Sequence, residues 1–256
     1  MKELIFLDID GTILNHENKI PEKTKQAIQS LKEKGHFVAI ATGRAPFMFE
    51  DIRKELDIDS FVSFNGQYVV FENKLLYKNP LNIDELHRIH HYSDEKGHPL
   101  VFMSEKSMKS SVPHHHYIEE SLSSLQFSHP EHDDDYYKNK EIYQALLFVE
   151  EHEEYLYENT FDDFNFVRWH PFSVDVIPKG GSKADGIKQM VEALGMKMED
   201  VYAFGDGLND IEMIQAVGTG VVMGNASNEV KQHANFITKS VDEDGLWYGL
   251  KELGLI

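Results

Sequence analysis

The sequence predicts an α/β protein built on a doubly wound parallel sheet, with a separate α+β domain inserted in its middle. Short apolar runs of the buried-strand type alternate with helical patterns at both ends of the 256-residue chain. This alternation stops between about residues 81 and 179 and then returns. Two of the apolar runs lead directly into acidic motifs, and open α/β sheets bind ligands at the carboxyl ends of their strands.

The N-terminal stretch alternates strands with helices that have clear start and stop signals. Pro21 and Pro46 open helices, and Gly35 ends the first of them. The predicted strands are residues 2–7, 37–41 and 61–64, and the predicted helices are residues 21–34 and 46–56. This β-α-β-α-β order predicts parallel strands with right-handed crossovers. After Asn65-Gly66, residues 68–71 and 74–77 are expected to form a hairpin.

The middle of the chain has a different character. Its predicted helices are residues 82–96, 114–125 and 151–160, and its predicted strands are residues 99–103, 142–149, 164–169 and 173–177. The acidic stretch Glu131–Asp135 is expected to be a solvated loop. The α/β rhythm then resumes with helices at residues 182–194, 210–216, 227–233 and 244–253 and strands at residues 201–204, 220–223 and 236–237. We therefore predict one core domain from residues 1–80 and 180–256, with residues 81–179 as the insertion.

Eleven of the fourteen histidines fall in this middle part, and two groups have spacings that could suit Zn²⁺. These are His114–His116 and the set His87, His90 and His91. Adjacent histidines on a helix point in different directions, so a structural zinc site is the weaker interpretation.

Composition excludes several classes of function. There are 25 basic and 44 acidic residues, a formal net charge of −19, so the surface would repel nucleic acid. No cysteine is present, which removes disulfides and thiolate chemistry. Asp8 interrupts the first apolar run, and no apolar run exceeds five residues, so neither a signal peptide nor a membrane span is expected. The default expectation is a cytoplasmic monomer or small homo-oligomer.

Asp8 and Asp10 stand two residues apart where the first strand ends. Side chains at this spacing share a face, so both carboxylates can face a pocket while Ile9 turns into the core. A helix-capping loop would use the same residue types, which makes this pair a weak signal by itself.

The run Gly205-Asp206-Gly207-Leu208-Asn209-Asp210 is the strongest single signal. A buried strand that leads into two acids and an amide is costly unless these groups bind something. Asp206 is the best candidate for a metal ligand, Asn209 can donate to phosphate, and Asp210 can orient the ligands from behind. Carboxylate oxygens suit Mg²⁺.

Two further positions could bind an anion. Thr42-Gly43-Arg44 lies between a predicted strand and a predicted helix, where a hydroxyl and free backbone N–H groups can hold phosphate oxygens. Lys183 lies at the start of a predicted helix and could supply a fixed positive charge. Each taken alone is equally consistent with a helix cap or a surface lysine.

Together the four segments resemble the motifs of the haloacid dehalogenase-like hydrolases. Asp8–Thr12 resembles the first motif, Thr42-Gly43 the second, Lys183 the third and Gly205–Asp210 the fourth. The position of the insertion is similar to that in the Cof-type sugar-phosphate phosphatases, which have a Rossmann-like core and a C2-type cap. Smaller matches are Asn65-Gly66, Met223–Ala226 and Asp244-Gly245, and the departure is Ala184, where relatives usually have glycine. The cap itself resembles the family only in size and position.

The resemblance implies a mechanism. Asp8 would be the nucleophile, ionised at neutral pH, and would form an aspartyl-phosphate. Asp10 would be the general acid and base, with a raised pKa. Mg²⁺ would be held by Asp8, the backbone carbonyl of Asp10 and Asp206, with Asp210 behind them.

Substrate phosphate would be held by Thr42, Gly43, Lys183 and Asn209. The cap would close over the site and contact the leaving group, with Trp169, His170, Asp175 and Lys179 as candidate contacts. The resemblance therefore implies a phosphatase that acts on a small phosphorylated metabolite, and the sequence leaves that substrate open.

Two other functions stay open. A phosphotransferase or phosphomutase would pass the phosphoryl group from the same intermediate to another acceptor, and the core motifs do not separate it from a phosphatase. A non-catalytic, phosphate-binding regulatory protein would keep the fold without turnover. The presence of every candidate catalytic residue argues against this last alternative.

Overall fold

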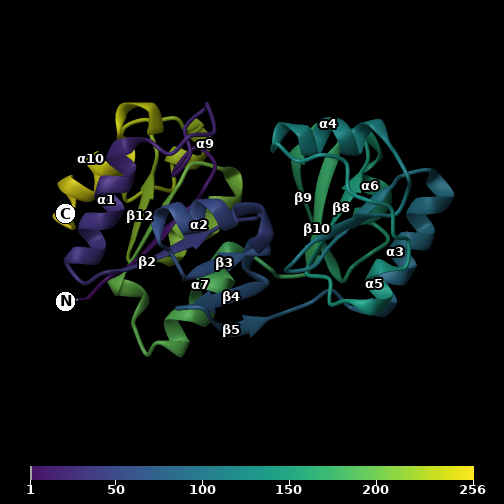
Figure 1. Ribbon diagram of the computed structural model, residues 1–256, viewed down its shortest axis with the longest axis horizontal. Helices are drawn as coiled ribbons and strands as arrows, with labels where there is room; N and C mark the ends of the chain where they lie inside the picture. Colours follow the sequence, from purple (N-terminus) through teal and green to yellow (C-terminus); the bar gives the residue numbers. More distant parts are fainter. Residues whose placement is uncertain (1) are drawn as a thin grey trace. The chain divides into compact units, whose positions relative to one another are not determined.

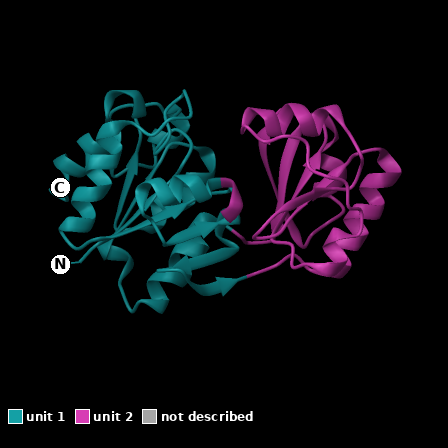
Figure 2. Ribbon diagram, in the orientation of Figure 1, with its two compact units in different colours: residues 1–44, 49–78, 182–256 teal, residues 45–48, 79–181 magenta. Residues whose placement is uncertain are grey.

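The computed structural model describes residues 2–256, which form two compact units (Figures 1 and 2). The first unit comprises residues 1–44, 49–78 and 182–256, and the second comprises residues 45–48 and 79–181. The sequence predicted the domain boundaries after residue 80 and before residue 180. Residues 45–48 group with the second unit, which sequence patterns did not anticipate. No helix within residues 2–256 combines the length and apolar character needed to cross a bilayer.

The first unit contains an eight-stranded sheet in the order β13-β12-β11-β1-β2-β3-β4-β5. Its strands are β1 (Leu4–Leu7), β2 (Phe37–Ala41), β3 (Phe61–Ser63), β4 (Tyr68–Phe71), β5 (Lys74–Lys78), β11 (Val201–Gly205), β12 (Thr219–Val222) and β13 (Phe236–Ile237). The six strands from β13 to β3 are parallel, and β4 and β5 form the antiparallel hairpin that the sequence predicts. Successive strands run outward from β1 in one direction and from β11 in the other, so the strand order reverses between these two neighbours.

Helices cover both faces of this sheet. They are α1 (Glu22–Glu33), α2 (Glu50–Leu56), α7 (Lys183–Ala193), α8 (Ile211–Ala216), α9 (Asn228–Lys231) and α10 (Gly245–Glu252). One apolar core packs α1, α2 and α10 against side chains such as Ile5 and Leu7. The other packs α7, α8 and α9 against Leu4 and Phe6. Alternate residues of β1 thus serve opposite cores, which confirms the predicted doubly wound α/β architecture.

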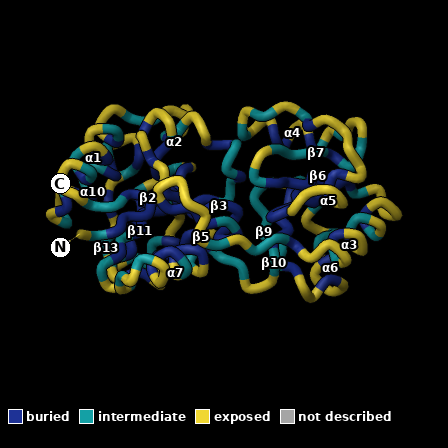
Figure 3. The backbone as a smooth tube through the Cα atoms, turned by 60° about the horizontal axis from the view of Figure 1, so that its bottom comes forward, coloured by how far each residue is buried: buried dark blue, intermediate teal, exposed yellow. Residues whose placement is uncertain are grey.

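The second unit contains a five-stranded antiparallel sheet in the order β7-β6-β8-β10-β9. Its strands are β6 (Leu100–Met103), β7 (Met108–Ser110), β8 (Gln144–Phe148), β9 (Phe164–His170) and β10 (Ser173–Pro178). Its helices are α3 (Ile83–Lys96), α4 (His116–Ser124), α5 (Tyr136–Asn139) and α6 (Tyr155–Glu158). The core of this unit combines side chains of α3, α5 and α6 with one face of the sheet. Figure 3 shows β6 and β10, two inner strands of this sheet, as largely buried.

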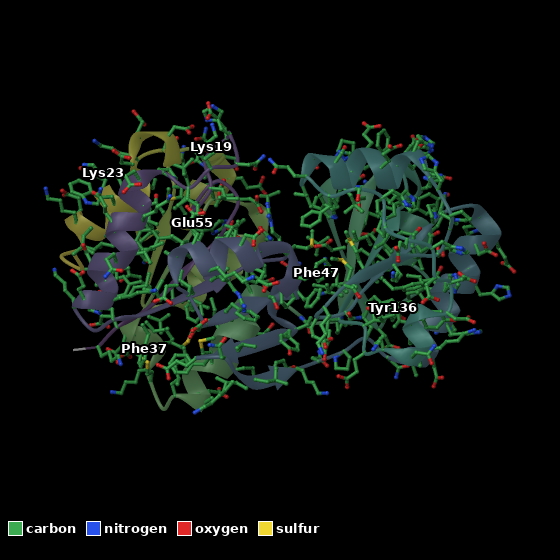
Figure 4. All side chains as sticks on the ribbon, in the orientation of Figure 1. Lys19, Lys23, Phe37, Phe47, Glu55 and Tyr136 are labelled. Atoms are coloured by element: carbon green, nitrogen blue, oxygen red, sulfur yellow. The ribbon has the colours of Figure 1, made fainter. Side chains whose placement is uncertain are left out.

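Three parts of the second unit differ from the sequence prediction. Strand β7 and helix α5 were not predicted, because each has only three or four residues and therefore no readable period. Helix α5 is fixed by Tyr136 (labelled in Figure 4), whose hydroxyl lies 2.7 Å from both the Ser104 and Ser107 hydroxyls. The helix predicted at residues 151–160 is only the 3₁₀ turn Glu151–Glu153 followed by α6.

Candidate active site

The candidate residues gather at the carboxyl edge of the parallel sheet. Asp8 directly follows β1, Thr42 follows β2, and Asp206 follows β11. The registers Leu7 with Phe204 and Leu7 with Ile40 bring these three strand ends side by side. The loops therefore meet where the strand order reverses, which is the usual ligand position in such sheets.

Lys183 is the first residue of α7 and joins two of the acidic motifs. Its Nζ donates to Asp8 Oδ1 at 2.6 Å and to Asp210 Oδ1 at 2.7 Å. All three side chains are almost fully buried. The start of α7 approaches the chain at Gly66, where φ is +103° and a side chain would overlap the Ser182 carbonyl. The Asn65-Gly66 sequence thus serves to let α7 bring its lysine into the site.

The Asp206 carboxylate accepts hydrogen bonds from two side chains. Its Oδ1 accepts from the Thr12 hydroxyl at 3.1 Å, and its Oδ2 accepts from Asn225 Nδ2 at 3.0 Å. Asn225 Nδ2 also donates to the Gly11 carbonyl at 3.0 Å, and its Oδ1 accepts from the Val241 amide at 2.9 Å. Gly11 has a φ of +78°, and a Cβ there would overlap the Asp206 carboxylate. The loop after β1 and the loop after β11 therefore pack closely against each other.

Asp210 organises the loop that carries Asp206. Its Oδ2 accepts from the Asp206 and Gly207 amides, each at 2.9 Å, while its Oδ1 accepts from Lys183. Because the side chain is fully buried, these contacts satisfy a carboxylate that would otherwise be very costly. Asp210 therefore holds the backbone of the loop that carries Asp206.

Burial dominates the electrostatics of this cluster. Burial and the nearby Asp210 carboxylate raise the pKa of Asp8 well above its usual range, although Lys183 opposes this. Burial and Asp210 likewise raise the pKa of Asp206 to about 7. Burial alone would lower the pKa of Lys183, but the Asp210 and Asp8 carboxylates outweigh it and raise that pKa. The sequence predicts that Asp8 is ionised at neutral pH; its raised pKa opposes this, and positive charge nearby would favour the ionised form.

The donor set fits a hard divalent cation. One carboxylate oxygen from each of Asp8, Asp206 and Asp210 lies within 4.8 Å of the others. Oxygen donors without nitrogen or sulfur favour ions such as Mg²⁺ or Ca²⁺. With Asp10, four carboxylates face two cations, Lys183 and Arg44, which leaves a formal charge of −2. A divalent cation would balance this charge and favour the ionised carboxylates.

Asp10 lies in a different environment from Asp8. Its side chain is half exposed and contacts Arg44, with Nη2 to Oδ1 at 2.6 Å and Nε to Oδ2 at 3.0 Å. Among the described residues, Asp10 is not part of the group of carboxylates within 4.8 Å of one another, although its charge acts on both Asp8 and Asp206. Arg44 directly follows Thr42-Gly43 in the sequence, but only the neighbouring positions of β1 and β2 reveal its partner.

Two of the predicted phosphate-binding residues, Gly43 and Asn209, lie next to Asn65. Asn209 Nδ2 donates to Asn65 Oδ1 at 3.4 Å, and a Cβ at Gly43 would lie 3.0 Å from Asn65 Nδ2. Asn65 and the preceding Phe64 both adopt left-handed backbone conformations, with φ of 50° and 52°. The Thr42 hydroxyl accepts from the Arg44 amide at 3.1 Å. The Asn65 contacts could not be found from sequence spacing, because they join segments about 20 and 144 residues apart.

Several histidines of the second unit have structural partners. His115 Nδ1 accepts from the Tyr117 amide and caps α4, and His129 Nε2 accepts from the His115 amide. His90 pairs with Asp134 at 2.8 Å. Within residues 2–256, the only group of acidic or histidine side chains close enough to share an ion is the aspartate cluster.

The candidate leaving-group contacts lie on or beside β9 and β10. Trp169 lies at an irregularity in the pairing of these strands. His170 Nδ1 lies 2.9 Å from the Ser121 hydroxyl. Asp175 is buried in β10, and the Lys179 amide donates to the Asp163 carbonyl at 2.9 Å. All belong to the second unit.

Comparison with known proteins identifies the relatives of this chain. The sequence model of the family described as haloacid dehalogenase-like hydrolase matches residues 5–250. YkrA of Bacillus subtilis, named as a candidate phosphatase, is 52% identical over 254 residues, 99% of this chain and 98% of that protein. A crystal structure from Geobacillus kaustophilus is 56% identical, with a TM-score of 0.96 and full coverage of both chains. The structure of the subclass IIB sugar phosphatase BT4131 is 30% identical, with a TM-score of 0.88 and full coverage of both chains.

Proposed function

Because the chain belongs to the haloacid dehalogenase-like hydrolases, we propose that it is a Mg²⁺-dependent phosphatase of small cytoplasmic phosphorylated metabolites. Sugar or polyol phosphates are the substrate class we favour, and the 30% identity to the sugar phosphatase BT4131 supports this choice. One observation carries the proposal: Asp8 is buried at a strand end, 2.6 Å from the Lys183 ammonium and beside Asp206 and Asp210. A nucleophilic carboxylate with this surrounding is suited to attack an anionic ester.

The reaction would proceed in two halves. In the first, an Asp8 oxygen attacks phosphorus, the ester P–O bond breaks, and Asp10 gives a proton to the leaving alkoxide. In the second, Asp10 takes a proton from water, which attacks phosphorus and frees Asp8. Two anions at 4 Å repel by about 4 kcal/mol at an effective dielectric of 20, and the Lys183 charge offsets part of this.

Asp8, Asp206 and the Asp10 carbonyl would hold Mg²⁺, which would supply positive charge that offsets the repulsion between the carboxylates and the substrate phosphate. The remaining phosphoryl oxygens would be held by the Thr42 hydroxyl, the Gly43 amide and the Asn209 side-chain amide. Asp210 would keep the Asp206 loop in place through its two backbone contacts.

Hydrolysis of p-nitrophenyl phosphate tests the proposal. Wild type and Asp8→Asn would be compared in Mg²⁺ and in EDTA, with Asp51→Asn on the exposed surface of α2 as the matched control. We expect activity that needs both Mg²⁺ and Asp8 and that survives in the control. A panel of sugar phosphates would then define the substrate. Folded wild type that hydrolyses neither the aryl ester nor the panel would contradict the proposal and favour phosphoryl transfer to another acceptor, or phosphate binding.

A further inference from the structure

The pair formed by Arg44 and Asp10 has no role in the chemistry described so far. The guanidinium contacts both carboxylate oxygens through two separate nitrogens, at 2.6 and 3.0 Å. The Arg44 side chain is only 11% exposed, whereas Asp10 is 50% exposed. A half-exposed aspartate side chain would otherwise be free to rotate. Here the contacts with an almost buried arginine restrict that rotation. Arg44 is thus the fixed member of the pair.

The fold anchors Arg44 from both sides. Its amide donates to the Thr42 hydroxyl at 3.1 Å, and its carbonyl accepts from the Phe64 amide at 3.3 Å. Phe64 belongs to the turn with left-handed backbone conformations, so the loop after β3 supports the loop after β2. The guanidinium therefore reaches Asp10 from a braced backbone. Such support is what keeps a reacting group within the narrow geometry that proton transfer requires.

We propose that Arg44 is a positioning residue that aims the Asp10 carboxyl group at the leaving oxygen of the substrate. The inference rests on the proposed function. In the first half of the reaction, the bond from phosphorus to the leaving oxygen breaks, the bond from Asp8 to phosphorus forms, and the Asp10 proton moves to the leaving oxygen. Asp10 ends this step as a carboxylate, and the planar fork of Arg44 matches a carboxylate through two parallel hydrogen bonds. Arg44 thus orients the acid and stabilises the charge that develops on it.

The inference predicts a dependence on the leaving group. p-Nitrophenolate departs without a proton, whereas the alkoxide of 4-nitrobenzyl phosphate needs one. General acid catalysis contributes roughly 10²–10⁴ in rate, so loss of its alignment should cost about 10- to 100-fold more on the benzyl ester than on the aryl ester. A residue that only binds phosphate or only supports the fold would affect kcat/KM for both esters equally.

The experiment compares kcat/KM for these two esters in wild type, Arg44→Gln, Arg44→Lys and Asp10→Asn. Arg88→Gln is the control, because Arg88 also contacts both oxygens of a carboxylate, that of Glu85 in the second unit. We expect selective loss on the benzyl ester in Arg44→Gln, only partial recovery in Arg44→Lys, and no selectivity in the control. The double variant with Asp10→Asn should be no more selective than Asp10→Asn itself.

Three outcomes would overturn the inference. Equal losses on both esters with a raised KM would make Arg44 a phosphate ligand. Wild-type kinetics in Arg44→Gln would leave the pair without a catalytic consequence. Additive losses in the double variant would show that Arg44 does not act through Asp10.

Thermal unfolding monitors folding, and Arg44→Lys, which keeps the charge and the aliphatic stem, carries the comparison if Arg44→Gln unfolds. Failure of wild type on both esters would instead refute the proposed function itself.

Discussion

Replacement of Asp206 by asparagine is predicted to stabilise the protein in EDTA at high pH and to remove its stabilisation by Mg²⁺. Burial and Asp210 raise the pKa of Asp206 from an ordinary value of 3.8 to about 7. The folded state then keeps a proton that the unfolded state has released. The contribution of the Asp206 carboxyl group to the free energy of unfolding is fully present below about pH 4 and is lost as the pH rises through 7. The difference of about three pKa units corresponds to roughly 4 kcal/mol.

Asparagine fits the position of Asp206. Its amide oxygen can accept from Asn225, and its amide nitrogen can donate to the Thr12 hydroxyl, which both donates and accepts. The substitution therefore removes the charge and keeps the hydrogen bonds. We expect the substitution to raise the free energy of unfolding by about 2 kcal/mol at pH 8 in EDTA. This is half of the full linkage value, because burial of the amide also removes its hydration.

Urea unfolding at pH 5 and pH 8, in EDTA and in excess Mg²⁺, measures this effect. Glu212→Gln, an exposed acid on α8, removes the same charge without burial and serves as the control. In EDTA the gain of Asp206→Asn should be large at pH 8 and small at pH 5. In Mg²⁺ the wild type should gain stability by mass action and the variant should not. A less stable variant at pH 8 in EDTA, or equal Mg²⁺ stabilisation of both proteins, would refute the reasoning.

Three further predictions concern the same site. Asp8→Asn should lower p-nitrophenyl phosphate turnover at least about 10³-fold with an unchanged circular dichroism spectrum, and substantial residual turnover would remove Asp8 as nucleophile. Gly11→Ala should cost about 2 kcal/mol in urea unfolding and most activity, whereas Gly35→Ala, with a similar φ of +85° but open space, should cost only about 1 kcal/mol and keep activity. Lys183→Met should cost about 3–5 kcal/mol in EDTA at pH 8, because it leaves two buried carboxylates without their cation, and unaltered stability would mean that they are not charged.

The core fold was predictable because its signals are local. Each strand of the parallel sheet is a short apolar run, and the flanking helices begin or end at proline, serine or glycine. Ser182, for example, caps α7 through a hydrogen bond from the Asp185 amide. The same signals failed in the second unit, where residues 150–154 hold four glutamates around one histidine. Like charges one turn apart disfavour a helix, and only a 3₁₀ turn and α6 form there.

The site was predictable only as far as strand ends fix positions. Asp8, Thr42 and Asp206 follow neighbouring parallel strands, so their proximity follows from the topology. The direction of a side chain beyond the strand end does not follow from the topology. The chain leaves the extended backbone of β1 after Leu7 and turns at Ile9, and the Asp10 carboxylate contacts Arg44. No sequence spacing contains this information.

The two aspartates of the first motif have environments that suit different tasks. Motif order alone assigned Asp8 as the nucleophile and Asp10 as the acid and base. The structure adds a physical distinction: Asp8 is buried against an ammonium group, where a cation must favour its charged form, and Asp10 is half exposed against a guanidinium. A nucleophile needs a fixed, dehydrated oxygen near the phosphoryl group, whereas an acid that becomes a base must exchange protons with water. These surroundings support the proposal that Asp8 is the nucleophile and Asp10 the general acid and base.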